Sequence, residues 1–504
     1  MRIATLTTGR VALLAGPTAL AFFSGGYFDE PRAWAGLGAW VLVVIALLAA
    51  PRALPRGRAT WLALGGLGLF AAWTLLSITW APIAGNAYHA GQLVVLYLGA
   101  LLAATMLLRG RETQRAVEPA LAAGALIVIG YGISERLLPG ALHFARSASA
   151  QGRLEQPLTY WNAMGELAAL GFVLCARIAG DGTRPAILRS AAGAAAAPLG
   201  LGLYLSFSRG ALFAGAAGLV ALVVLAPRLE QLIAMASTIV AGGLAAAAAA
   251  PFGGVTALLG SPATRERQGA IVLGLLVLIT AAAGVSQWYL TRRRPREIRL
   301  PRQAPWIAVG VICAGLALAI VAGAKEQTKQ PLGAGASRYF TLQSNRYAYW
   351  RVAMRAFDTE PLRGVGAGGW SVWWLRYRTI PEFAQDAHSL PLQTLAELGV
   401  VGLALLAAFL AGIGVAARAA QTAAPALAAG PIAGFVVYVT HAPLDWDWQM
   451  PAVTLVAMVL AGALLALAED RRRGNGLRQP AITYAPVTAD GPIDDRVRIG
   501  NHQA

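Results

Sequence analysis

A polar insert rich in arginine and aromatic residues interrupts an otherwise apolar chain. It reads "NRYAYWRVAMRAFDTEPLRGVGAGGW" over 345–370. Arg351 and Arg355 lie four residues apart, and two like charges at this spacing on a helix repel unless an anion lies near them. Arg346 falls in the first turn, where the helix dipole is already positive and favours an anionic ligand. The arrangement suits an anionic ligand such as phosphate, but spacing alone favours a solvated amphipathic helix with ordinary surface arginines.

A histidine at the end of the insert is the candidate proton acceptor. His388 stands in "DAHSL", beside Asp386 and ahead of Gln393 and Glu397. Histidine acts as a general base near neutral pH. A packed or helix-capping histidine is the structural alternative. Glu397 falls two helical turns into the next apolar stretch, where a carboxylate usually has a partner or a function.

A further arginine lies between two apolar stretches with almost no loop around it. Arg209 stands in "SFSRG", after Ser206 and Ser208. Its planar guanidinium suits phosphate oxygens if it points into a helix bundle. An arginine at a membrane boundary more commonly extends its charged end to the surface.

The rest of the insert is predicted to be a helix followed by a glycine turn. Residues 344–358 place one apolar face on a helix, made of Tyr347, Trp350, Met354 and Phe357. The run "GVGAGG" at 364–369 lacks the flanking strand and helix of a dinucleotide-binding motif, so we interpret it as a turn. The following indoles are expected at the lipid interface or against sugar rings; they are Trp370, Trp373 and Trp374.

The elements that position these residues are predicted to be membrane helices. The chain has 504 residues, of which 57% are hydrophobic and 13% charged. Apolar runs of about 20 residues recur, each long enough to cross a bilayer as a helix. The fourteen predicted spans are 10–27, 34–51, 60–80, 90–108, 116–134, 159–179, 187–206, 210–227, 231–250, 270–291, 305–324, 390–414, 426–442 and 450–468.

The charge pattern predicts an orientation and argues against nucleic-acid binding. The net charge is +17, but the arginines cluster between apolar runs on the side of the N-terminus, as the positive-inside rule expects. With that side cytoplasmic, the insert faces outside together with 143–162, 206–210, 386–390 and 441–449. The loop "SPATRERQG" is the point where a missed span would invert this arrangement. The two cysteines, Cys175 and Cys313, lie in apolar runs and form no metal motif.

We therefore expect four regions. They are an N-terminal transmembrane bundle (1–324), a large extracytoplasmic loop (325–389), C-terminal transmembrane helices (390–470) and a disordered cytoplasmic tail (471–504). The fold class is all-α and polytopic, with about 12–14 transmembrane helices and short helices in the large loop.

The order of the motifs resembles the O-antigen ligase and polymerase family of bacterial membrane glycosyltransferases. The resemblance spans roughly 155–465 and rests on "SFSRGALFAG", the insert, "AHSLPLQTLAELGVVGLALL" and an Asp/Trp stretch before the last span. It implies transfer of a glycan from an undecaprenyl-diphosphate-type carrier to an acceptor hydroxyl at the outer face of the inner membrane. The reaction usually inverts the sugar and needs no metal and no cofactor. The implied partners are this donor, a glycan, lipid or lipid-linked acceptor, and membrane lipid.

The resemblance also assigns roles to residues. It implies that Arg209 and Arg346 contact the diphosphate, with Arg351 and Arg355 as alternatives, and that His388 activates the acceptor. The expected supporting residues are Ser208, Asp386, Gln393, Glu397, Asn162, Arg153, Trp370 and Asp445.

Two other functions fit the same sequence. A transporter or lipid-glycan flippase would use buried carboxylates such as Glu166 or Glu397, although the two halves of the chain show no inverted repeat. A structural subunit of a polysaccharide assembly machine would have the same arginines but would catalyse no reaction. Among enzymes, a ligase, a polymerase and an oligosaccharyltransferase differ in an acceptor that the sequence does not specify.

Overall fold

The computed structural model describes residues 2–50, 53–292 and 344–472, and in these residues every regular element is a helix. Ten of the described helices are long and apolar enough to cross a membrane. This confirms the all-α polytopic class. The ten are α2 (Asp29–Ala49), α3 (Arg58–Leu76), α4 (Ala84–Leu107), α5 (Arg111–Leu137), α6 (Trp161–Gly180), α7 (Ala186–Ser206), α9 (Leu229–Ala249), α11 (Pro262–Arg292), α15 (Leu390–Ala423) and α17 (Pro451–Arg472).

Three further helices coincide with predicted spans. They are α1 (Arg2–Ala21) and the shorter apolar helices α8 (Arg209–Leu225) and α16 (Pro425–His441). Span 305–324 lies outside the described residues, as do residues 325–343, Cys313 and the tail from 473. The predicted first span, 10–27, begins and ends later in the sequence than helix α1 does. α1 ends at Ala21, and a short turn of 3-10 helix, η1 (Ser24–Gly26), leads into α2.

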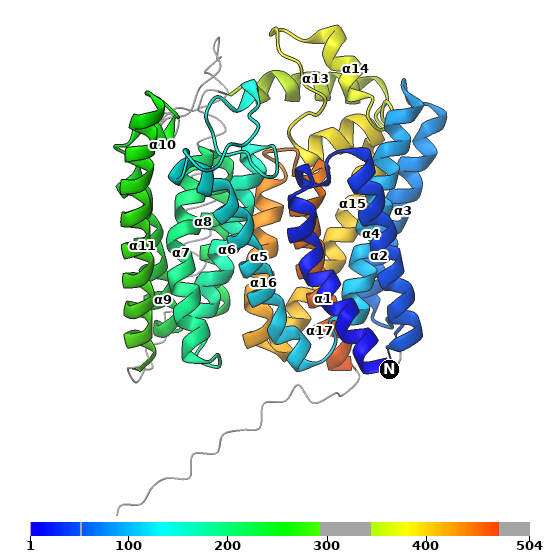
Figure 1. The fold of residues 1–504 in the computed structure, drawn as a ribbon. Coiled ribbons are helices and arrows are strands. Elements are labelled where there is room, and N and C mark those ends of the chain that lie inside the picture. The colour runs from blue at the N-terminus through cyan, green and yellow to red at the C-terminus, as the bar shows by residue number, and fades with distance from the viewer. Residues whose placement is uncertain (1, 51–52, 293–343, 473–504) are drawn as a thin grey trace, which may run out of the picture.

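Helices α6 and α17 form the centre of the bundle. Their apolar stretches are buried along the whole length, whereas α2 and α11 expose most of theirs at the periphery (Figure 1). Small residues allow the helices to approach closely, as is usual in membranes. A Cβ on Gly200 of α7 would lie 2.3 Å from the Cα of Gly242 in α9. The alanine and glycine content of the sequence therefore serves helix packing.

The predicted outside stretches gather at one end of the bundle. The loop helices α13 (Arg346–Thr359) and α14 (Trp370–Tyr377) cover the end opposite the N-terminus (Figure 1). Arg136 donates hydrogen bonds to Gly152 O at 2.7 Å and to Val255 O at 2.9 Å. These bonds join the 143–162 loop to the short helix α10 (Gly253–Thr256), directly before "SPATRERQG". That loop therefore lies at the expected end of the bundle.

The glycine run attaches the polar insert to a break in helix α15. Gly399 has φ 64° and ψ −166°, which interrupts the helix. The carbonyls before the break accept from the glycine run, with Val365 N to Ala396 O at 3.0 Å and Gly366 N to Glu397 O at 2.8 Å. The predicted turn is confirmed, and it pairs with the backbone of a membrane helix.

Glycine is required at this junction for space and for backbone conformation. Gly364 has φ +70°, and a Cβ there would lie 2.2 Å from the carbonyl carbon of Glu397. Gly366 has φ +90°, and a Cβ there would lie 2.4 Å from the Cα of Ala81, which precedes α4. L-residues rarely adopt this conformation.

The insert has its own small core, and its packing corrects two predictions. The buried face of α13 is made of Ala348, Tyr349, Val352, Ala353 and Ala356. The predicted face was wrong, because Met354 is exposed and the wide indoles of α14 require small residues opposite them. Trp370 and Trp374 are fully buried and stacked, with ring centroids 5.5 Å apart, so neither faces lipid or a sugar.

We predict that Gly364→Ala destabilises the junction. The positive φ alone costs about 1–2 kcal/mol, and the contact with the Glu397 backbone adds to it because backbone cannot move aside. Thermal unfolding in detergent should show a lower Tm. Gly414→Ala is the matched control, since Gly414 lies in the same helix α15 with no atom within 4 Å of an added Cβ. Equal Tm values for the two variants would contradict the proposed role of the junction.

Candidate functional site

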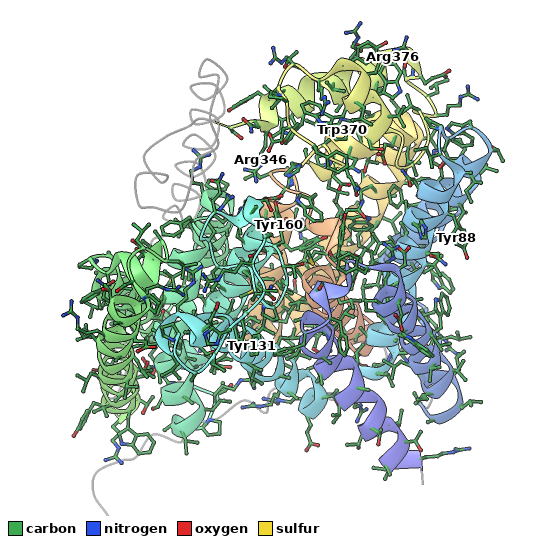
Figure 2. All side chains as sticks on the ribbon, turned by 45° about the horizontal axis from the view of Figure 1, so that its top comes forward. Tyr88, Tyr131, Tyr160, Arg346, Trp370 and Arg376 are labelled. Carbon is green, nitrogen blue, oxygen red and sulfur yellow. The ribbon has the colours of Figure 1, made fainter. Side chains whose placement is uncertain are left out.

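An ion pair joins the polar insert to the last loop of the bundle. Arg346, in the first turn of α13, donates to Asp445 Oδ2 at 2.6 Å. Tyr160 OH donates to Asp445 Oδ1 at 2.5 Å, and Asn162 donates to the Tyr160 oxygen at 2.7 Å. Figure 2 shows Arg346 beneath the loop helices and facing Tyr160. Three predicted site residues, Arg346, Asp445 and Asn162, therefore belong to one network.

Both members of this pair are held in their ionised forms. Burial raises the pKa of the Asp445 carboxyl, but the nearby positive charges, Arg346 first, outweigh it, so the net pKa is below its ordinary value. Burial lowers the pKa of Arg346, but Asp445 outweighs that effect, and the net pKa is raised. The Arg346 side chain remains 21% exposed. Asp445 accepts one of its five N–H groups, so the guanidinium retains donors for a ligand.

His388 lies between aromatic rings with one defined tautomer. Its Nδ1 lies 2.9 Å from the backbone oxygen of Asp386. A carbonyl only accepts hydrogen bonds, so Nδ1 carries the proton and Nε2 of the neutral ring carries the lone pair. The ring centroid is 5.0 Å from that of Tyr349 and 6.2 Å from that of Trp446. This geometry suits a base that acts through Nε2.

Arg209 approaches the same turn of α13 from the bundle. It is the first residue of α8, and the Ser208 side chain caps this helix by accepting from Ala211 N at 3.2 Å. Burial raises the pKa of Tyr347, while the positive charges of Arg209 and Arg346 oppose that shift. Both arginines therefore lie within electrostatic range of Tyr347, the second residue of α13. Arg346 and His388 lie against the first turns of α13, and Arg209 acts on them from the start of α8.

Two of the predicted arginines point elsewhere. The Arg355 guanidinium lies over the ring of Tyr377, 3.8 Å from its centroid. Arg351 is exposed on the outer surface of α13. Arg346 is therefore the arginine of this helix that the structure places among the other candidates.

Arg153 is close to the site but is engaged in holding its own loop. Its guanidinium stacks on Trp161, 3.6 Å from the ring centroid, and donates to Ala150 O at 2.7 Å and to Ser149 O at 2.6 Å. We therefore assign Arg153 to the shape of the 143–162 loop.

The supporting residues after His388 form a polar chain that fixes the insert on α15. Gln393 donates to Asp386 Oδ1 at 2.9 Å, and its own oxygen accepts from Ala387 N at 3.2 Å. Glu397 Oε1 accepts from Trp370 N at 3.3 Å, at the start of α14. Glu397 therefore holds the insert on α15. Trp370 takes part in this attachment through its backbone N–H and not through its indole ring.

A fully buried acidic cluster was not recognised from the sequence. His441 Nδ1 lies 2.5 Å from Asp447 Oδ2 and 3.3 Å from Glu166 Oε2, and none of the three side chains is exposed. His441 and Asp447 bracket Asp445, so their contact fixes the loop that presents it. The sequence shows only "HAPLDWDWQ", and Glu166 lies 275 positions before His441, so spacing gives no signal for the cluster.

This cluster is the one group within the described residues that could offer three ligands to a metal ion. Ligands about 2.0–2.2 Å from a zinc ion lie roughly 3 Å apart. The 2.5 Å contact between His441 and Asp447 is shorter and is that of a close, charge-assisted hydrogen bond. The arrangement fits a hydrogen-bonded cluster better than a metal centre.

Residues 252–407 match a family model described as O-antigen ligase. The matched stretch runs from α10 through the polar insert into α15 and contains Arg346 and His388, whereas Arg209 and Asp445 lie outside it. No curated protein matches the chain significantly. The match confirms the resemblance to the O-antigen ligase and polymerase type over this stretch. The ten apolar helices agree with a multi-pass membrane protein.

We predict that Asp386→Asn raises stability at neutral pH. Burial raises the pKa of Asp386, and the hydrogen bond from Gln393 only partly offsets this. A group whose folded pKa lies above its unfolded value favours folding as pH falls and opposes it above the folded pKa. The variant should therefore have the higher Tm near pH 7, and the difference should disappear below about pH 4, where the carboxyl is protonated in both states. A Tm difference that grows towards acid pH would contradict this account.

Proposed function

We propose that this protein is an integral-membrane glycosyltransferase of the O-antigen ligase or polymerase type. It moves a glycan from a polyprenyl-diphosphate carrier to an acceptor hydroxyl at the outer face of the inner membrane. The observation that carries the proposal is that Arg346 and His388 lie against the first turns of α13, with Arg209 of the distant helix α8 within electrostatic range of Tyr347. The O-antigen ligase match supports the reaction class.

The two arginines stabilise the leaving group. A departing diphosphate gathers negative charge on its oxygens, and fixed guanidinium groups in a site of low dielectric constant stabilise that charge. Arg346 stands at the positive end of α13 and is oriented by Asp445. Arg209 stands at the positive end of α8. In this proposal the two guanidinium groups, each at a helix N-terminus, bind one anionic ligand.

His388 accepts the proton of the acceptor. The acceptor oxygen attacks the anomeric carbon and forms the new glycosidic bond, while the bond from that carbon to the diphosphate oxygen breaks. The hydroxyl proton moves to Nε2, since Nδ1 already carries one and donates to Asp386 O. A single displacement of this kind inverts the anomeric configuration.

A transporter or lipid-glycan flippase is the second candidate, and the buried Glu166, His441 and Asp447 are the observation that favours it. Intramembrane acids commonly mark ion pathways. The other carboxylate named for this function, Glu397, is bonded to the insert backbone at Trp370 and so serves as an anchor. A flippase would move the lipid without releasing polyprenyl diphosphate.

We predict that His388→Ala folds normally and loses glycan transfer by about 10²–10⁴-fold, the usual contribution of a general base. Purified protein in nanodiscs would receive a polyprenyl-diphosphate-linked oligosaccharide and an acceptor, and release of polyprenyl diphosphate would be measured with EDTA present. The control is His143→Ala, an exposed histidine of the 143–162 loop. Full activity of the His388 variant would remove the proposed base.

We predict that Arg209→Lys loses at least 90% of turnover, because a point charge replaces a planar group that binds two phosphate oxygens at once. The matched control is Arg376→Lys, an exposed arginine on α14 at the outer edge of the insert (Figure 2). The same assay gives the rates. Equal rates for the two variants would place Arg209 outside the site.

A further inference from the structure

The loop that joins α16 to α17 contacts two of the three parts of the proposed site. Asp445 of this loop binds Arg346. The backbone oxygen of Ala442 accepts a hydrogen bond from Leu390 N at 2.9 Å, two residues after His388. The loop therefore fixes both Arg346 and the segment that carries His388. The third part of the site lies on α8, which is reached by a buried side chain at the beginning of this loop.

That side chain is His441, the last residue of α16. Gly210 directly follows Arg209 in α8, and a Cβ on Gly210 would lie 2.9 Å from His441 Nε2 and 3.1 Å from its Cδ2. The edge of the imidazole therefore packs directly on the first turn of α8. Gly210 lies in regular helix, so glycine is required here by the lack of space and not by the backbone conformation.

The His441 ring is held on its other side, so it cannot move away from α8 freely. Its Nδ1 lies 2.5 Å from Asp447 Oδ2 and 3.3 Å from Glu166 Oε2, and all three side chains are fully buried. Glu166 belongs to the central helix α6. The backbone oxygen of Asp447 accepts from Thr454 Oγ1 of α17 at 2.7 Å. The ring thus connects α6 and α17 to the start of α8.

Helix α6 also supports the turn that leads into α8. A Cβ on Gly165, the residue before Glu166, would lie 2.6 Å from Ser206 Oγ and 2.9 Å from the Cβ of Ala211. Ser206 Oγ in turn accepts from Ser208 N at 3.2 Å. The start of α8 is therefore held from two sides, by α6 and by the His441 ring.

We infer that His441 is a positioning residue of the proposed site. Its ring fixes the start of α8, and with it Arg209, relative to the loop that holds Arg346 and adjoins His388. The inference rests on the proposed function and adds to it a residue that touches neither donor nor acceptor. Two arginines that bind one diphosphate must keep a fixed separation, and a displacement of about 1 Å in such a site can cost about 10²-fold in rate.

A double-mutant cycle tests the contact. Gly210→Ala adds the Cβ that meets His441, so it should displace the start of α8. His441→Asn keeps a side-chain N–H where the imidazole has Nδ1 and leaves no atom where it has Nε2. It therefore retains a donor for Asp447 and makes room for the added Cβ.

The cycle would be measured on the full-length protein in nanodiscs, by the transfer assay and by titration with polyprenyl diphosphate. We expect Gly210→Ala to lower turnover at least tenfold and to weaken polyprenyl diphosphate binding at least fivefold. In the His441→Asn background, the same alanine should change both by less than twofold. If Gly210→Ala alone does not fold, recovery of folded protein and of Tm in the His441→Asn background reports the same coupling.

Gly215→Ala is the matched control. Gly215 lies in the same helix α8, and an added Cβ would meet the Cβ of Ala169 at 3.3 Å and not His441. Its effect should be the same with and without His441→Asn. Both Gly210→Ala and His441→Asn should raise the KM for the donor and leave the KM for the acceptor unchanged. A merely structural role of His441 would reduce the amount of folded protein and leave both KM values unchanged.

Two results would overturn the inference and leave the proposed function standing. The first is an equal cost of Gly210→Ala in both backgrounds, which would show that the alanine does not act through His441. The second is wild-type turnover and donor KM in the folded single variants, which would show that the contact does not position Arg209. Wild-type protein that neither binds polyprenyl diphosphate nor transfers glycan would overturn the proposed function and the inference with it.

Discussion

The structure depends on one backbone constraint, the pairing of the glycine run with the break in α15. A helix that breaks inside a membrane protein frees carbonyl and amide groups that must find other partners. On one side of Gly399 the run supplies the donors Val365 N and Gly366 N. On the other side, Pro361 O, just before the run, accepts from Val400 N at 2.9 Å. The same pairing fixes α13 and α14 over the bundle and sets the position of His388 ahead of α15.

Electrostatics then fixes the state of the arginine in the proposed site. Asp445 holds Arg346 in an ionised, oriented state. A glycosyl transfer from a diphosphate needs charge stabilisation for the leaving group and a base for the acceptor. We propose that Arg346 and Arg209 supply the first and His388 the second.

The apolar periodicity of the sequence predicted where the membrane helices lie along the chain. A membrane helix must satisfy its backbone internally and carry about 20 apolar residues. The periodicity also predicted that the stretches with the candidate site residues lie at one end of the helix bundle. It could not identify partners, since Arg346 bonds to a carboxylate 99 positions away. It gave the wrong buried face for α13, because that face is set by Trp370 and Trp374, which follow in another helix. Contacts between distant segments leave no periodic signal in a single sequence.

The most direct measurement is a cryo-EM structure of the protein with polyprenyl diphosphate in nanodiscs. The account predicts that diphosphate oxygens lie within hydrogen-bond distance of the guanidinium groups of Arg209 and Arg346. The end of the diphosphate that would carry the glycan should face Nε2 of His388. Diphosphate bound elsewhere, at the other end of the bundle or beside the exposed Arg351, would contradict the claim that these three residues form one active site.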